Sequence, residues 1–155
     1  MGQIITKEEL KKVIENLKKQ NKKTVFTNGC FDILHIGHTR YLKASKNCGD
    51  VLVVGLNSDA SVKKIKGETR PINSQNDRAE ILSELNFVDY VVIFDETSPS
   101  DLIDFIKPDI YTKGADYTIE TLPEAPVVKK NNIEVHFIKF VEGKSTTSVI
   151  EKISK

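Results

Sequence analysis

A turn with two histidines follows the first β-rich run of the chain, at 24–28. The segment reads Thr27-Asn28-Gly29-Cys30-Phe31-Asp32-Ile33-Leu34-His35-Ile36-Gly37-His38. A glycine directly after a strand lets the backbone approach a ligand closely, and a helix N-terminus directs free N–H groups at an anion. The two histidines stand three residues apart, where the next helix is expected to open. Both side chains can contact one phosphate, so this spacing favours phosphate binding.

Three other interpretations of this segment stay open at this point. The pair His35 and His38 has the spacing of a zinc site, although no third ligand stands nearby in the sequence. One histidine can be a hydrogen-bonded core residue. Gly29 can belong to an ordinary turn.

The elements that must position this segment alternate between helix and strand. Thr6 with Glu9 forms a capping box, and apolar residues then recur at helical spacing, which predicts an N-terminal helix within 1–22 that carries no chemistry. Helices are predicted for 37–47 and 75–86, from Ser98-Pro99 onward, and from about Thr146 to the C-terminus. Short β-rich or continuously apolar runs predict five strands, at 24–28, 51–56, 90–94, 109–112 and 135–138.

Strands separated by helices predict an α/β fold with a doubly wound, Rossmann-like, five-stranded parallel sheet. Ligands bind such sheets at the carboxyl ends of the strands, near the point where the strand order reverses. Polar clusters follow the predicted strands in the same way, at 28–38, 57–59, 113–117 and 143–147. The sequence therefore predicts one site at this edge of the sheet.

Size and composition favour a single domain, with 1–22 as an N-terminal helix and 23–155 as the α/β core. The chain has 155 residues, 39% hydrophobic and 29% charged, and a formal charge of +1. This balance gives no reason to expect a nucleic-acid or membrane partner. No secretory signal or membrane-length apolar run is visible. Two cysteines do not make a disulfide framework, so a cytoplasmic location is expected.

Asn28-Gly29-Cys30-Phe31-Asp32 followed by His35-Ile36-Gly37-His38 resembles the signature of the HxGH nucleotidyltransferase superfamily. The resemblance continues along nearly the whole chain after the first helix, at 55–59, 66–67, 70–72, 77–79, 88–89, 108–109, 113–117 and 142–147. Together these segments are most similar to the adenylyltransferase domain of the bifunctional heptose-phosphate kinase/adenylyltransferase. No segment of the sequence resembles the kinase half, so the chain resembles a stand-alone version of the adenylyltransferase domain. Glycerol-3-phosphate cytidylyltransferase is a more distant look-alike.

The resemblance implies transfer of AMP from ATP to a sugar phosphate, D-glycero-D-manno-heptose 1-phosphate, with release of pyrophosphate. The acceptor phosphate is already largely anionic at neutral pH, its second pKa being about 6, so no strong general base is required. The chemistry then depends on positioning and on stabilising charge. Mg²⁺ is expected on the triphosphate, with no metal site made by the protein alone. Relatives commonly form dimers, so a homodimer is also expected.

The resemblance also assigns roles to the residues of the first loop and of the segments that follow it. His35 and His38 should contact the nucleotide phosphates, which residues 27–32 and Gly37 should help to cradle. Lys66 should neutralise a phosphate. Lys63 and Lys64 stand close to it in the sequence, so which of the three lysines reaches the phosphate stays open. Arg78 should reach into the site from its helix, or else be a surface charge.

Further nucleotide contacts are implied after the last two predicted strands. Lys113, Gly114 and Asp116 should frame the base and ribose, unless Asp116 is a turn former. Ser145, Thr146 and Thr147 resemble a second phosphate-binding motif, with an ordinary N-cap as the alternative. The acceptor is expected to contact a pair of polar residues after the second strand, Asn57 and Asp59.

Two departures from the family pattern put the acceptor in question. Lys144 stands where the glycerol-phosphate relatives usually carry an apolar residue, and 122–126 is unusually proline-rich, which could reshape the acceptor pocket or a dimer contact. Cys30 is expected to serve packing and not redox chemistry. Cytidylyl transfer to glycerol 3-phosphate or another polyol phosphate remains an alternative, as does a nucleotide-binding module without turnover. A hydride-transferring protein is disfavoured because Gly-x-Gly-x-x-Gly is missing.

Overall fold

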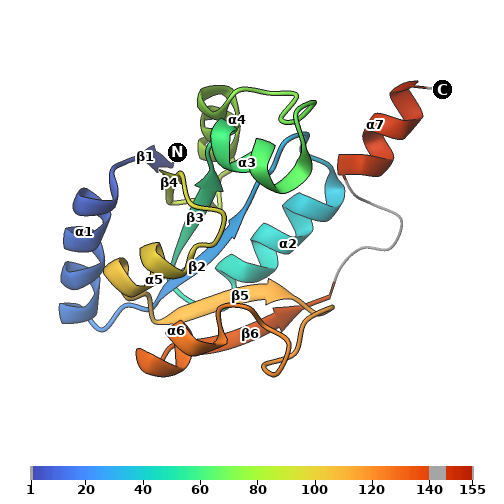
Figure 1. The fold of residues 1–155 in the computed structure, drawn as a ribbon. Coiled ribbons are helices and arrows are strands. Elements are labelled where there is room, and N and C mark those ends of the chain that lie inside the picture. Colours follow the sequence, from blue (N-terminus) through green and yellow to red (C-terminus); the bar gives the residue numbers. More distant parts are fainter. Residues whose placement is uncertain (1, 140–145, 155) are drawn as a thin grey trace.

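The chain folds around one parallel sheet with helices on both faces (Figure 1). The computed structural model describes residues 2–139 and 146–154. The elements in chain order are β1 (Gln3–Ile4), α1 (Lys7–Lys19), β2 (Thr24–Gly29), α2 (Ile36–Lys46), β3 (Val51–Asn57), α3 (Asp59–Lys66), α4 (Gln75–Ser83), β4 (Tyr90–Phe94), α5 (Ser100–Ile106), β5 (Ile110–Gly114), α6 (Ala125–Lys130), β6 (Glu134–Ile138) and α7 (Thr146–Ser154). The predicted α/β class with a parallel sheet is confirmed.

The sheet has six strands in the order β1-β4-β3-β2-β5-β6, one more than predicted. The additional strand, β1, is two residues long and pairs Gln3 with Tyr90 and Ile4 with Val91 at the edge of β4. Two residues are too few to show a strand period in the sequence. The five predicted strands are confirmed, and their ends differ from the predicted ones by at most two residues.

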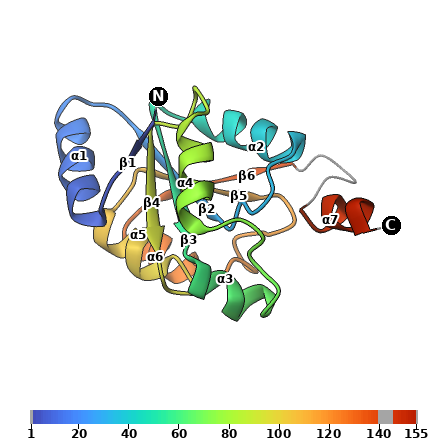
Figure 2. The same ribbon diagram turned by 90° about the horizontal axis from the view of Figure 1, so that it is seen from above.

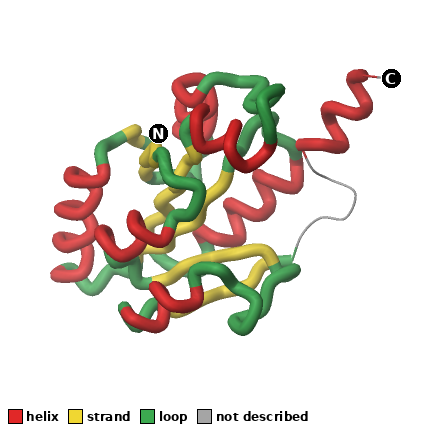
Figure 3. Tube along the Cα trace, viewed as in Figure 1, coloured by secondary structure: helices red, strands yellow, loops and turns green. Residues whose placement is uncertain are grey.

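Two hydrophobic layers hold the helices against the sheet, because successive residues of a strand point to opposite faces. In β3, Val53 packs into the layer covered by α1, α5 and α6. Its neighbours Leu52 and Val54 pack into the layer covered by α2 and α4. Both faces of the central strands are therefore buried, which explains their unbroken apolar runs. The strands lie between the helices in the tube view and in the view from above (Figures 2 and 3).

Two of the predicted helix starts differ in detail. Thr6 caps α1 as predicted, its hydroxyl accepting from the Glu9 N–H at 3.2 Å. The Glu9 carboxylate accepts from the Thr6 hydroxyl at 3.1 Å, where a full capping box would have it accept from the Thr6 backbone N–H. The helix expected to begin with Ser98 as its cap begins one position later, with Pro99 as the N-cap of α5.

The parallel sheet brings the carboxyl ends of its strands to one edge. The strand order reverses between β2 and β5, since β3 lies on one side of β2 and β5 on the other. Loops after β2, β3, β4 and β5 meet at this point. Figures 1 and 2 show α7 at one end of the molecule, beyond the start of α2. No helix in the described ranges has the length and apolar character needed to span a membrane.

Candidate active site

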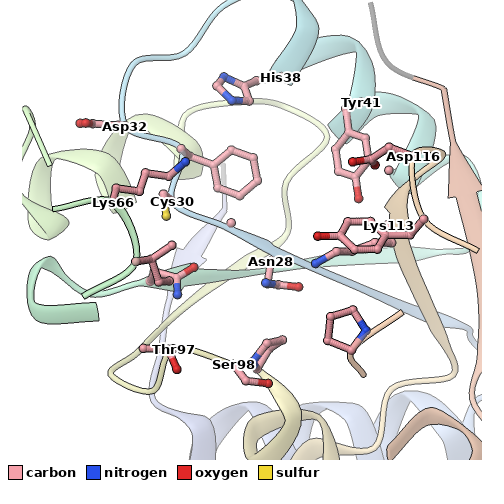
Figure 4. A pocket seen from close by; sticks show the side chains of 18 of the residues that line it. Asn28, Cys30, Asp32, His38, Tyr41, Lys66, Thr97, Ser98, Lys113 and Asp116 are labelled. Carbon is pink, nitrogen blue, oxygen red and sulfur yellow. The ribbon is translucent and has the colours of Figure 1, made fainter. Parts of the chain in front are cut away.

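A cavity of about 610 Å³ opens at the carboxyl edge of the sheet, where the strand order reverses. Most of the predicted site residues line it together: Asn28, Gly29, Cys30, Phe31, Asp32, His35, Gly37, His38, Asn57, Lys66, Lys113, Gly114, Asp116 and Thr147. Figure 4 shows Lys66 and Lys113 on opposite sides of this cavity, with Asn28 between them. These predicted residues therefore share one cavity at this edge of the sheet.

The turn after β2 is shaped by Phe31, which takes the left-handed conformation with φ of +45°. Its ring is buried and packs over Gly29, where an added Cβ would lie 2.8 Å from the ring. A glycine is therefore required at position 29 because a side chain there would collide with the Phe31 ring. The same ring meets His38 edge-on, with 5.4 Å between the ring centroids.

The two histidines are held at the start of α2 by the backbone. His35 is the N-cap, and its Nδ1 accepts from the Gly37 N–H at 3.1 Å. His38 Nδ1 accepts from the His35 N–H at 3.3 Å, and the two rings stack with centroids 3.9 Å apart. A neutral His38 ring that accepts at Nδ1 carries its proton on Nε2, from which it can donate to a ligand.

The pKa of His38 is lowered to about 4 by burial first, and then by electrostatic interaction with His35 and with Lys66. The ring is neutral at pH 7 in the absence of a ligand. An anionic phosphate nearby would offset both effects, because it favours the charged form. Within the described residues, no three His, Cys, Asp or Glu side chains come together as a metal site.

Arg78 lies beneath the first loop, and this differs from the expected position. Its side chain has no exposed surface and does not line the cavity. The guanidinium donates to the carbonyl oxygens of Cys30 at 2.7 Å, Asn57 at 2.8 Å and Asn73 at 3.0 Å, and to Asp59 at 2.8 Å. Arg78 therefore joins the ends of β2 and β3, the two strands that present the site.

The segment after β3 forms α3, a helix that was not predicted. Asn57 lines the cavity and donates to the Ser61 hydroxyl at 2.9 Å, whereas Asp59 is the ion-pair partner of Arg78 and does not line it. Of the three clustered lysines, Lys66 at the end of α3 is the one that lines the cavity.

The floor of the cavity contains a hydrogen-bonded group that sequence reasoning missed. The Tyr111 hydroxyl lies 2.6 Å from Asn28 Oδ1 and 2.7 Å from Glu124 Oε1. Lys113 donates to the same Glu124 oxygen at 3.2 Å. The pKa of Tyr111 is raised, by burial and then by the charge of Glu124. Glu124 and Pro123 bring the proline-rich segment 122–126 to the cavity wall.

Other predicted site residues have different positions. Thr27 is fully buried, with its hydroxyl 2.8 Å from the Tyr41 hydroxyl, and does not line the cavity. Thr147 lines the cavity from the first turn of α7. Ser145 and Lys144 lie outside the described residues, and of Thr146 only its place at the start of α7 is described.

Both cysteines are free thiols. The pKa of Cys30 is raised by burial, and the nearby positive charges of Lys66, Arg78 and Arg70 only partly oppose this effect. The thiol therefore stays protonated at neutral pH, which agrees with a packing role. Cavity residues without a predicted role include Tyr41, Arg70 and 97–99, and no spacing pattern in the sequence marks them as a group.

Comparison with known proteins identifies the family. The cytidylyltransferase-like family profile matches residues 26–152. The chain is 60% identical to bifunctional protein HldE of Campylobacter concisus over 94% of this chain and 30% of the relative, and 52% identical to that of Wolinella succinogenes over 97% and 31%. It thus spans about a third of the length of these relatives.

A solved structure described as the lipopolysaccharide core biosynthesis protein from Thermoplasma volcanium is 36% identical, with a TM-score of 0.63. The similarity covers 79% of this chain and 99% of that one. The profile match includes the turn and the paired histidines that line the cavity. The chain therefore belongs to the cytidylyltransferase-like family and is a nucleotidyltransferase.

Proposed function

We propose that the protein transfers AMP from Mg·ATP to a sugar phosphate, D-glycero-D-manno-heptose 1-phosphate, giving ADP-heptose and pyrophosphate. The observation that carries the proposal is the stacked pair of His35 and His38 at the start of α2, in one cavity with Lys66. The similarity to HldE over most of this chain supports heptose chemistry for this site.

In the proposed reaction, an oxygen of the acceptor phosphate attacks the α-phosphorus of ATP. The new phosphorus–oxygen bond forms as the bond to the β-phosphate oxygen breaks, and pyrophosphate leaves with the electron pair. His35 and His38 contact the phosphates, His38 donates from Nε2 to a phosphate oxygen, and Lys66 neutralises the charge that builds up. The acceptor oxygen is already anionic, so no side chain has to remove a proton.

The cavity is divided by charge, which suggests how the substrates lie. His38, Lys66 and the N-terminus of α2 suit the phosphates, whereas Glu124 on the floor would repel them. Figure 4 shows His38 on the side of the cavity away from Thr97 and Ser98. We place the phosphates of the substrates near His38 and Lys66. The hydroxyl groups of the substrates then lie toward Glu124, whose carboxylate accepts their hydrogen bonds.

We further propose that the enzyme works in the cytoplasm as a homodimer. The two free thiols are consistent with a reducing compartment. Light scattering during size-exclusion chromatography would measure the oligomeric state.

The test is to incubate the purified protein and Mg²⁺ with each nucleoside triphosphate and each candidate acceptor, and to measure pyrophosphate release. ATP with heptose 1-phosphate should give the highest kcat/KM and a product with the mass of ADP-heptose. Release only with CTP and glycerol 3-phosphate would establish cytidylyl transfer instead, which the family match also accommodates. Binding of ATP without pyrophosphate from any acceptor would point to a module without turnover.

A further inference from the structure

Arg70 is a cavity-lining arginine whose position is fixed by a buried carboxylate. Its Nε donates to Asp32 Oδ2 at 3.1 Å, and the Asp32 side chain is 1% exposed against 13% for Arg70. Asp32 also accepts from the backbone N–H groups of Ile72 at 2.8 Å and Asn73 at 2.9 Å. One carboxylate therefore ties the segment around Arg70 to the turn after β2.

The guanidinium of Arg70 uses only one of its donors in hydrogen bonds to the described residues. Of its five N–H groups, the one on Nε is used by Asp32. Neither terminal nitrogen bonds to a described residue, and Nη2 is also buried. With Nε anchored, the planar guanidinium holds Nη1, the terminal nitrogen that is not buried, in a fixed orientation from which it can donate to a phosphate oxygen.

A second cation, Lys66, lines the same cavity. The charges of Lys66 and Arg70 both act on the thiol of Cys30, and that of Lys66 also acts on His38. The two cations therefore lie around the turn that presents the histidines. A reaction between a triphosphate and a phosphate monoester brings two anions into this space, so it requires cations beyond those that hold the nucleotide.

We propose that Arg70 binds the phosphate group of the acceptor, a phosphate monoester dianion, and that Asp32 is the residue that positions it. The inference rests on the proposed function and assigns the subsite for the attacking group. With the acceptor phosphate held by this guanidinium, one of its oxygens is directed at the α-phosphorus while Arg70 itself gains and loses no proton.

The experiment compares Arg70→Gln and Arg70→Lys with Arg40→Gln, a matched control because Arg40 is exposed on α2 and does not line the cavity. The Ile72 and Asn73 N–H bonds to Asp32 do not depend on Arg70, so the loop should keep its fold. Circular dichroism and thermal unfolding check this. Calorimetry then measures binding of α,β-methylene-ATP with Mg²⁺, and kinetics measures KM for heptose 1-phosphate.

Both Arg70 variants should raise the acceptor KM at least about tenfold, the equivalent of one lost charge-assisted bond, and leave nucleotide affinity within about twofold. Lysine should not restore the KM, because it cannot hold Asp32 and a phosphate at once. Asp32→Asn should also raise the acceptor KM more than it changes kcat. An unchanged acceptor KM, or an equal loss of nucleotide affinity, would overturn the proposal.

A binding experiment that requires no turnover separates this inference from the proposed function. Inorganic phosphate is titrated into protein already loaded with Mg²⁺ and α,β-methylene-ATP, which requires no turnover. Arg70→Gln should weaken phosphate binding at least about fivefold relative to Arg40→Gln. Equal binding, or none to the unaltered protein, would count against the subsite. Absence of turnover with heptose 1-phosphate, by contrast, counts against the proposed acceptor alone.

Discussion

The rings of His35 and His38 stack 3.9 Å apart, and each accepts a backbone N–H through Nδ1. This arrangement holds both rings in one rigid unit at the start of α2, and it orients Nε2 of a neutral His38 ring as a hydrogen-bond donor. A preorganised donor costs no reorganisation when charge develops on a phosphate.

Loss of one member of this pair should affect turnover far more than stability. We expect His38→Ala to lower kcat about 100- to 1,000-fold, because a contact to the transition state is removed. Steady-state pyrophosphate release measures the effect. His136→Ala is the matched control, since His136 lies on β6 and pairs with Glu134 away from the cavity. A folded His38 variant with full activity would disprove the assigned role.

The pKa of about 4 for His38 predicts proton uptake when the nucleotide binds. The anionic phosphates should raise this pKa, so the complex binds more protons than the free protein, and affinity should increase as pH falls toward 4. Calorimetry at about pH 5.5 in two buffers of different ionisation enthalpy counts the protons. The His38→Asn variant should take up fewer protons when the nucleotide binds. Because ATP is the same in both experiments, the difference between the two proteins also corrects for protonation of ATP itself. Equal uptake by both proteins would exclude His38 as the group that titrates.

Arg78 should prove essential to stability. Arg78→Ala removes a buried guanidinium and leaves Asp59 and three carbonyl oxygens without their donor. We expect the free energy of unfolding to fall by about 3 to 5 kcal/mol and Tm by roughly 10 °C. Urea and thermal unfolding measure both quantities, with Arg40→Ala as the exposed control. A Tm within about 2 °C of that of the unaltered protein would contradict this role of Arg78 in stabilising the fold.

The Tyr111 hydroxyl should contribute measurably to stability. Tyr111→Phe leaves the buried Glu124 carboxylate with one partner fewer and should cost about 1 to 3 kcal/mol. Tyr90→Phe is the control, because no hydrogen bond to its hydroxyl is present among the described residues. Chemical denaturation at pH 7 compares the two variants. Equal stabilities would show that the hydroxyl is not needed for this part of the cavity floor.

The sequence predicts the central strands and the first loop well for a physical reason. Strands such as Val51–Asn57 are buried on both faces and so carry continuous apolar runs, and the histidines lie within one turn of helix. These features are local, so they can be seen without knowing the fold.

Features that depend on distant partners could not be predicted in this way. Arg78 looks like a surface charge on α4 until the carbonyl oxygens of Cys30 and Asn57 are placed beside it. The short helix α6 was missed because Pro123 precedes it and Pro126 lies within it, although Pro126 stands in the first turn, where the missing N–H is tolerated. Glu124 could be recognised as a cavity residue only after folding brought it to Tyr111.

The two-residue strand β1 has a practical consequence for handling the protein. It covers the outer edge of β4, and Gly2 donates to the Ser83 carbonyl at 2.8 Å in a space where an added Cβ would lie 2.6 Å from Val88 O. Deleting the first five residues would uncover backbone donors and acceptors along β4, ready to pair with another molecule. Such a truncation should therefore favour aggregation.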